Sequence, residues 1–386
     1  MPADTPSHAR TLLPSEVTSR RRFLAASAGF ACAFLARQAA AQDGLPAAES
    51  DAADAPSGAP LTVTSWTPAF DYDGARRDIS YALSTGTRKR WRICALYPHL
   101  KDPYWLSVNY GMVERARGLG LRLEILEAGG YPNLERQRKQ LTDCLSRDFD
   151  AVILGTVSFD GVSDLVQQLA QRLPLVAAVN DIANDGITAK VGVSWVDMGR
   201  AIGRYFASRH PRGSAPKKVA WFPGPKGAGW VTFIEKGVTE ELERSAGRIV
   251  TTQWGDTGTE AQLLLIEDAL EQHPDIDVII GSAVTADAAI PVLRARELSD
   301  HIQVLADYFT HSVYRGIKRG KVVAAPTDYP VLQGMLAVEQ ALRSIEGTLA
   351  YPHVGPSIKI LDGESITQQD IQNSLAPAWF QPVFRV

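Results

Sequence analysis

Hydrophobic and polar positions follow two alternating periods from Trp91 onward. Short apolar runs of strand length alternate with segments in which apolar residues recur every three or four positions. This pattern predicts four strands and three helices over residues 91–180, four helix–strand pairs over 196–309, and a long helix over 331–346. The predicted strands cover residues 93–98, 121–128, 151–156, 174–180, 217–224, 248–255, 277–283 and 302–309. We therefore expect an α/β fold of two doubly wound parallel-sheet lobes with a ligand cleft between them.

The first 60 residues depart from this alternation. Residues 19–24 (SRRRFL) precede an apolar run that ends at Leu35, and three alanines at 39–41 resemble a cleavage site. The run is about a dozen residues, shorter than the roughly 20 that span a membrane. We expect an export signal cleaved after Ala41. Paired arginines before Phe-Leu resemble a twin-arginine signal, and an ordinary secretory signal is the alternative.

Two further segments precede the alternating region. Residues 42–60 are rich in Ala, Pro, Ser and Asp, which predicts a flexible leader. Residues 61–90 are predicted to form an extended N-terminal arm, whose aromatic side chains pack on the body of the protein. These aromatic residues are Trp66, Phe70, Tyr72 and Tyr81.

Composition narrows the classes of function. A chain of 386 residues with 45% hydrophobic content can bury about two ordinary domains. Removal of residues 1–41 takes away five arginines and two acidic residues, which leaves a net charge of −6 and no basic patch for nucleic acid. Only Cys94 and Cys144 remain. An oxidising compartment would permit a bridge between them, but a buried strand and a helix carry them, and we favour two buried thiols.

The first strong strand is followed by a loop with two aromatic residues, Tyr104 and Trp105. Ligands of open α/β sheets bind at the carboxyl ends of strands, so this loop is a candidate ligand site. The alternative is a hydrophobic staple at the start of the following helix. Asp102 before Pro103 also suits a helix cap with proline at the first helical position.

Longer blocks of sequence point to a family. Two such lobes behind an export signal resemble periplasmic binding proteins of the ribose-binding kind (type I), in which the chain crosses between lobes three times. Within that class the chain resembles the trimethylamine-N-oxide sensor proteins of the TorT type over residues 66–386. The blocks are ALYPHLKDPYWLSVNYGMVE, VSFDG, FPGPKGAGWV and APTDYP. The twin-arginine pattern departs from the general secretory signal expected in that family.

The resemblance implies a domain organisation and a function. It places the three crossings of the hinge near Val193, Tyr308 and Asp328. Lobe 1 would then comprise residues 91–192 and 329–352, and lobe 2 residues 193–328 and 353–386. The implied protein is a non-catalytic receptor that binds trimethylamine N-oxide and contacts the periplasmic domain of a membrane sensor histidine kinase. That kinase promotes expression of the terminal reductase.

The chemistry of trimethylamine N-oxide selects candidate residues. Its methyl groups surround a positively charged nitrogen, which aromatic faces attract, and its oxygen requires hydrogen-bond donors. Aromatic candidates at predicted strand ends or crossings are Tyr104, Trp105, Tyr131, Trp195, Trp230 and Tyr308. Each ring alone could instead be core or interlobe packing. Carboxylate candidates are Asp102, Asp307 and Asp328, for which a helix cap or a hinge hydrogen bond is the alternative.

The end of the fourth strand bears on the choice of ligand. Asn180 stands there, where related sugar-binding proteins often place an arginine. The cleft is therefore less suited to a polyol, and Asn180 joins the candidate binding residues.

Other motifs are incomplete. The glycine-rich segment 223–230 lacks the Gly-Lys-Ser/Thr ending of a phosphate loop, and the sequence has no H-E-x-x-H, zinc-ligand or G-x-S-x-G pattern. We expect no metal, no cofactor and no enzymatic activity, and neither nucleic-acid binding nor direct membrane insertion. The main alternative is a solute-binding receptor of an ABC transporter for a sugar or quaternary amine. An enzyme for a small metabolite is a further alternative, because doubly wound lobes host many chemistries.

Overall fold

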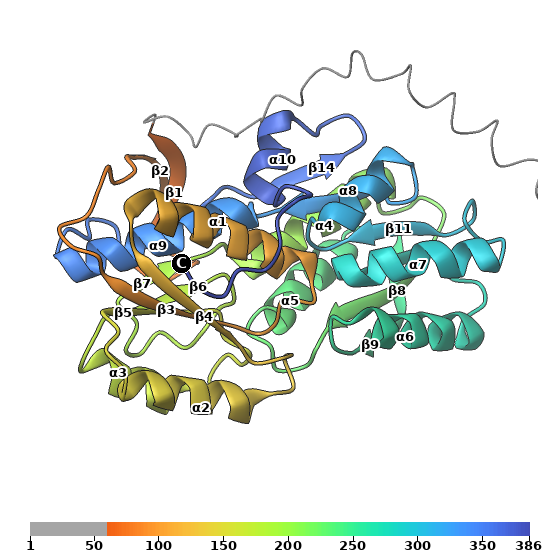
Figure 1. Cartoon of the computed structure of the whole chain (residues 1–386). Helices are drawn as coiled ribbons and strands as arrows, with labels where there is room; N and C mark the ends of the chain where they lie inside the picture. Colours follow the sequence, from red (N-terminus) through yellow and green to blue (C-terminus); the bar gives the residue numbers. More distant parts are fainter. Residues whose placement is uncertain (1–59) are drawn as a thin grey trace, which may run out of the picture. The chain divides into compact units, whose positions relative to one another are not determined.

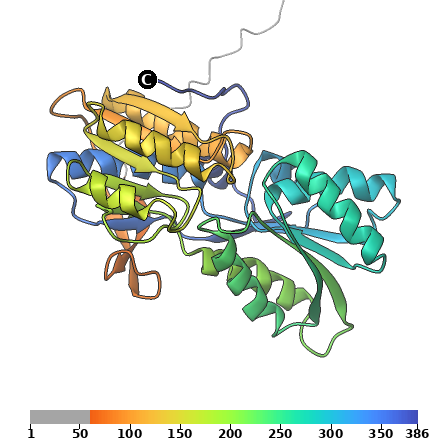
Figure 2. The ribbon, with the colours of Figure 1, turned by 90° about the horizontal axis from the view of Figure 1, so that it is seen from below.

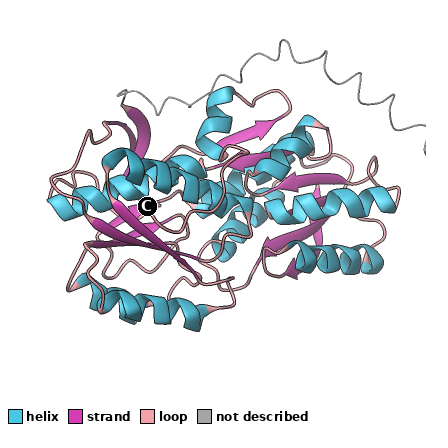
Figure 3. Cartoon of the chain, viewed as in Figure 1, coloured by secondary structure: helices cyan, strands magenta, loops and turns pink. Residues whose placement is uncertain are grey.

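The structure is a computed structural model and describes residues 60–386 (Figure 1). The predicted signal peptide and all but the last residue of the predicted leader lie outside the described residues. From residue 60 the chain forms three β-sheets with helices packed against them, as Figure 3 shows by colour. No helix in this range is both long enough and apolar enough to cross a membrane.

The first lobe is built on an eight-stranded sheet in the order β2-β1-β13-β7-β6-β5-β3-β4. Its six strands from β13 to β4 are parallel, and β1 and β2 form an antiparallel edge. The strands are β1 (Leu61–Thr67), β2 (Ala75–Tyr81), β3 (Arg92–Tyr97), β4 (Arg122–Glu127), β5 (Ala151–Leu154), β6 (Leu175–Ala178), β7 (Ala189–Val191) and β13 (His353–Gly355).

Both faces of this sheet are buried because helices cover both. Alternate residues of one strand enter different cores: Ile93 and Ala95 pack on the side of α1 (Pro103–Leu119) and α9 (Pro330–Glu346). Cys94 and Leu96 pack on the side of α2 (Leu134–Leu145) and α3 (Ser163–Ala170). Strands buried on both faces explain the continuous apolar runs of the sequence.

The second lobe contains a four-stranded parallel sheet in the order β11-β10-β8-β9. Its strands are β8 (Lys217–Gly224), β9 (Gly247–Trp254), β10 (Val278–Gly281) and β11 (Gln303–Ala306). Its helices are α4 (Trp195–Arg209), α5 (Val231–Leu242), α6 (Thr259–Gln272), α7 (Ala283–Ala295) and α8 (His311–Lys318). The predicted fold class, with two parallel-sheet lobes, is confirmed (Figure 2).

The chain crosses between the lobes at positions that differ in part from the prediction. It leaves the first lobe after β7, near Val193, and returns after β12 (Ala324–Thr327), at Asp328. The predicted crossing near Tyr308 is wrong, because β11 continues into α8 and β12, which pack on the second lobe. The third crossing follows β13, since β13 pairs with β7 whereas β14 (Lys359–Asp362) pairs with β12. Helix α10 (Gln368–Ser374) comes next.

At the edges of the large sheet, two chain segments differ from the predicted domain organisation. β13 at residues 353–355 and the last residues of the chain belong with the first lobe, although residues 353–386 were predicted for the second. The backbone of Phe384 accepts a hydrogen bond from Ile125 of β4 (2.9 Å), and Val386 bonds with Leu123. The predicted N-terminal arm forms the β1–β2 hairpin at the opposite edge. Strand edges carry unpaired backbone groups, which these chain ends satisfy.

Helices α1 and α9 bring two loops of the site together. A Cβ atom on Gly111 would lie 2.0 Å from the carbonyl oxygen of Val331, and one on Gly334 would lie 2.3 Å from that of Val108. Glycine at both positions therefore permits close helix packing. The starts of α1 and α9 consequently place Asp102 and Asp328 on the same side of the sheet.

Candidate ligand-binding site

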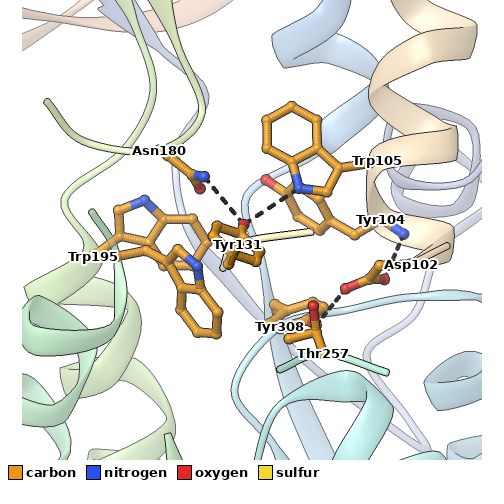
Figure 4. Close-up of a pocket in the computed structure, with 9 residues that line it drawn as sticks. Asp102, Tyr104, Trp105, Tyr131, Asn180, Trp195, Thr257 and Tyr308 are labelled. Carbon is orange, nitrogen blue, oxygen red and sulfur yellow. Dashed lines mark hydrogen bonds between the residues drawn. The ribbon is translucent and has the colours of Figure 1, made fainter. Parts of the chain in front are cut away.

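A small cavity lies where loops of both lobes meet (Figure 4). Its volume is about 10 Å³, near the limit for one water molecule. Nine residues line it: Asp102, Tyr104, Trp105, Tyr131, Asn180, Trp195, Trp230, Thr257 and Tyr308. Among these residues there is no lysine or arginine, so aromatic rings and a carboxylate dominate the site.

The start of α1 places three of these residues. Asp102 is the N-cap, and its Oδ1 accepts a hydrogen bond from the Tyr104 backbone N–H (2.9 Å). Its Oδ2 accepts one from the Tyr308 hydroxyl (2.6 Å). Both interpretations of Asp102 therefore apply, because one oxygen caps the helix and the other faces the opposite lobe.

Trp105 occupies its position because Gly155 leaves room for it. A Cβ atom on Gly155 would lie 2.4 Å from Cη2 of the Trp105 indole. The Trp105 ring also packs against Tyr97, with centroids 5.3 Å apart. Only 2% of Trp105 is exposed, so this ring forms part of the core and part of the cavity wall.

Two tyrosine–aspartate pairs polarise the site. Tyr308 donates to Asp102, and Tyr104 donates to Oδ2 of Asp328 (2.7 Å), which also accepts from Gln333 (2.7 Å). Burial raises the pKa of Asp102 to about 6, against the hydrogen bonds that it accepts, and burial likewise raises the pKa of Asp328 to about 6. A phenol that donates to a carboxylate has a more electron-rich ring, which strengthens its attraction for a cation.

The hydrogen bonds leave two donors available at the cavity. The Tyr131 hydroxyl oxygen accepts from Asn180 (3.1 Å) and from Trp105 (3.4 Å). Both lone pairs are thus engaged, and the hydroxyl proton remains to be donated. The indole N–H of Trp230 is buried and has no hydrogen-bond partner among the described residues. That of Trp195 donates to the Val179 carbonyl (3.0 Å).

The six rings form an aromatic box in which most neighbouring rings meet edge to face, whereas Trp195 and Trp230 are tilted by 46°. Tyr308 lies 5.4 Å from Tyr104 and 5.9 Å from Trp230, at interplanar angles of 80° and 89°. Trp195 lies 5.5 Å from Trp230. Rings at these different angles present several faces to one small volume, an arrangement suited to a compact methylated cation.

The structure gathers eight of the ten residues chosen from sequence around this cavity. The other two do not line it. Asp328 accepts a hydrogen bond from the Tyr104 hydroxyl without lining the cavity itself. Both carboxylate oxygens of Asp307 are buried without a hydrogen-bond partner in residues 60–386. Burial and the nearby Asp102 raise the pKa of Asp307 well above its usual range. Asp307 follows the last residue of β11, is fully buried and does not line the cavity.

Sequence reasoning missed Thr257 and His99. Thr257 lines the cavity, and its hydroxyl lies 3.1 Å from Nε2 of His99 in the other lobe. Each follows a strand, β9 or β3, so the strand-end rule would have included them. A search restricted to aromatic rings and carboxylates passed over both.

Three contacts between the lobes close the cleft. They are the Tyr308–Asp102 and His99–Thr257 hydrogen bonds and a backbone bond from Asp181 N–H to Gly229 oxygen (3.0 Å). Asp102, Tyr308 and Thr257, which make two of these contacts, also line the cavity. The structure therefore represents the closed arrangement of the two lobes.

No group of three or more His, Cys, Asp or Glu side chains in residues 60–386 is arranged to hold a metal ion. Cys94 and Cys144 are buried free thiols, with Sγ atoms 3.4 Å apart.

Two lobes closed on a buried cavity at their strand ends define a small-molecule receptor of the periplasmic-binding-protein class. Residues 90–380 match the family of periplasmic binding proteins and sugar binding domain of the LacI family. The chain belongs to this family.

Individual relatives narrow the class. The chain is 39% identical over 325 residues to periplasmic protein TorT of Escherichia coli (strain K12), covering 82% of this chain and 93% of the relative. A crystal structure of the TorS sensor domain–TorT complex in the presence of TMAO (trimethylamine N-oxide) matches with a TM-score of 0.70 at 39% identity, over 76% of this chain and 99% of that one. The predicted resemblance to the TorT type is therefore confirmed.

A second solved structure is equally similar. It is an ABC transporter solute-binding protein from Bradyrhizobium sp. BTAi1 with bound bis-tris, which matches with a TM-score of 0.72 at 41% identity. The match covers 84% of this chain and 98% of that one. These relatives are periplasmic or solute-binding proteins, so the chain is a binding protein of the periplasmic class rather than an enzyme.

Proposed function

We propose that this protein is a periplasmic receptor that binds trimethylamine N-oxide and signals through a membrane sensor histidine kinase. The kinase would then induce the trimethylamine-N-oxide reductase system. The observation that carries the proposal is the aromatic box with two unused hydrogen-bond donors, the Tyr131 O–H and the Trp230 N–H.

The ligand fits this set of groups one by one. Its methylated nitrogen would lie against the rings of Tyr104 and Tyr308, each contact contributing about 0.5–2 kcal/mol. Its oxygen would accept from Tyr131 and Trp230. A cavity of about 10 Å³ must expand even for this ligand, and far more for a sugar ring. The lining also lacks the arginine that a polyol site would use.

The partner follows from the relatives. TorT at 39% identity forms a complex with the TorS sensor domain, in the presence of TMAO and in the absence of ligand. This similarity over nearly the whole relative supports a sensor domain of the same kind as partner here. We also propose export by the segment before residue 42, with cleavage after Ala41 and the twin-arginine route.

Calorimetry with three related ligands tests the proposed ligand. Trimethylamine N-oxide should bind, tetramethylammonium should bind more weakly because it lacks the oxygen, and neutral tert-butanol more weakly still because it lacks the charge. Equal affinity for all three, or no heat from the N-oxide at millimolar concentration, would contradict the proposal. Co-elution with a purified sensor domain tests the partner separately.

A second candidate is a solute-binding receptor of an ABC transporter for a quaternary or tertiary amine. The relative with bound bis-tris, which is itself a tertiary amine, favours this candidate. Neighbouring genes discriminate the two: a permease and an ATPase indicate transport, whereas a sensor kinase and a reductase indicate signalling. Uptake of labelled trimethylamine N-oxide that depends on this protein would support transport.

A further inference from the structure

His99 joins three parts of the closed site. It is fully buried, and its Nδ1 lies 3.4 Å from the backbone N of Asp102, whose side chain holds Tyr308. Its Nε2 lies 3.1 Å from Oγ1 of Thr257, on the second lobe. Its ring meets the edge of Tyr131, with centroids 5.6 Å apart. One imidazole therefore contacts the cap of α1, a donor of the cavity and the opposite lobe.

These contacts determine the form of the ring. A backbone N–H can only donate, so Nδ1 of His99 must accept from Asp102 and carries no proton. Nε2 then carries the proton and donates to Thr257. The Thr257 hydroxyl uses a lone pair in this bond, which leaves its own proton for the cavity that it lines. In a protonated imidazole, Nδ1 would also carry a proton. The N–H groups of His99 and Asp102 would then point at each other and could not form a hydrogen bond.

Burial of His99 favours the neutral form of its ring, against part of the surrounding charge. Burial lowers the pKa of His99 to about 4, and the nearby Lys101 also lowers it. Asp256 from the second lobe and Glu127 from β4 act in the opposite direction but do not offset burial. The Asp102 carboxylate is engaged by Tyr104 and Tyr308, so it does not pair with the ring.

We propose that His99 is a positioning residue that holds the cleft closed only as a neutral imidazole, so that protonation of His99 weakens ligand binding by opening the lobes. The proposal rests on the proposed function only for the choice of ligand. In the open state the ring would meet water and regain an ordinary pKa of about 6.5. At any pH at which His99 is protonated in the open form, closure around the ligand must then release that proton.

Proton release on binding measures this step directly. At pH 5.5 an imidazole of pKa about 6.5 carries about 0.9 proton, and one of pKa about 4 carries almost none. Calorimetry with trimethylamine N-oxide in buffers of different ionisation enthalpy should therefore show about 0.9 more proton released by the wild type than by His99→Gln. Glutamine can donate to Thr257 but cannot titrate. His301→Gln, at an exposed position, is the matched control and should behave as the wild type.

Affinity gives a second readout. Between pH 7 and 5.5 the wild type should lose about eightfold more affinity than His99→Gln, because only the wild type must expel the proton. Asp102 titrates in the same window but is present in both proteins, so the difference isolates His99. Thr257→Val removes the acceptor of the His99 N–H and should bind more weakly at all pH values.

Nuclear magnetic resonance of the wild type avoids dependence on any variant. His99 should titrate near pH 4 in protein saturated with trimethylamine N-oxide. Titration near 6.5 in that state, or equal proton release by wild type and His99→Gln, would overturn the proposal. A wild type that binds no trimethylamine N-oxide at pH 7–8 would overturn the proposed ligand instead. The role of His99 is then decided by small-angle scattering of the ligand-free protein. The radius of gyration should increase between pH 7 and 5.5 more in the wild type than in His99→Gln, and an equal change in both would overturn the proposal.

Discussion

Replacement of Trp230 by phenylalanine removes one indole N–H and keeps an aromatic ring in place. In the structure this N–H is buried without a partner among residues 60–386, and Trp230 is only 3% exposed. If the N-oxide oxygen accepts from it, the variant loses a hydrogen bond to a charged acceptor. Such bonds contribute about 1.5–3 kcal/mol, so the dissociation constant for trimethylamine N-oxide should rise about 10- to 150-fold.

The matched control is Trp195→Phe. Trp195 is 4% exposed and lines the same cavity, but its N–H already donates to Val179. This variant should lose stability because the carbonyl loses its partner, without discrimination between ligands. Both variants are titrated calorimetrically with trimethylamine N-oxide and with tetramethylammonium, which lacks the oxygen.

The ratio of the affinities for trimethylamine N-oxide and tetramethylammonium shows whether the Trp230 N–H donates to the ligand oxygen. Trp230→Phe should weaken the N-oxide selectively and leave tetramethylammonium within a few-fold. Trp195→Phe should change both ligands in parallel. If Trp230→Phe weakens both ligands equally, the indole contributes only its ring, and the assignment of its N–H to the oxygen is refuted.

Three further predictions concern packing, pH and thiols. Gly155→Ala should lower the free energy of unfolding by about 1–3 kcal/mol and weaken ligand binding, because the added Cβ would displace Trp105. Denaturant titrations with and without ligand measure the stability and the ligand binding. Asp102→Asn keeps a helix cap but cannot ionise. The folded pKa of Asp102, about 6, exceeds its ordinary value of 3.8, so its stabilising contribution is full below pH 3.8 and is lost as the pH rises through 6. The stability of Asp102→Asn relative to wild type should therefore increase from pH 4 to 7, and a constant difference in melting temperature would contradict this. Cys94 and Cys144 should resist alkylation in the folded protein and both be labelled in denaturant without reductant, as mass spectrometry detects.

The alternation of strands and helices could be predicted from the sequence because each parallel strand is buried on both faces and is therefore apolar. Every strand from β3 to β6 and from β8 to β11 coincides with a predicted apolar run. The short strands β7, β12 and β13 escaped prediction. They are three or four residues long, and their pairing comes from segments far apart in sequence, as between His353 and Lys190.

The site was predictable to the extent that it follows the strand-end rule. Tyr104, Trp105 and Tyr131 were chosen for their position after a strand, and all three line the cavity. Asp307 met the same criterion but does not line the cavity, because the rule gives the edge of the sheet and not the position of each side chain. His99 and Thr257 lacked a chemical signal in the sequence, since their roles depend on each other across the cleft.

The sequence by itself determined the two α/β lobes, the cap at Asp102 and the set of rings available for a cavity. These depend on local periodicity and on residue chemistry, which the chain carries without its partners in space. The tertiary structure alone decided which hydrogen-bond donors remain unused and which residues meet across the cleft. Tyr308 reaches Asp102 over 206 positions of sequence, and only the closure of two lobes brings such distant groups within bonding distance.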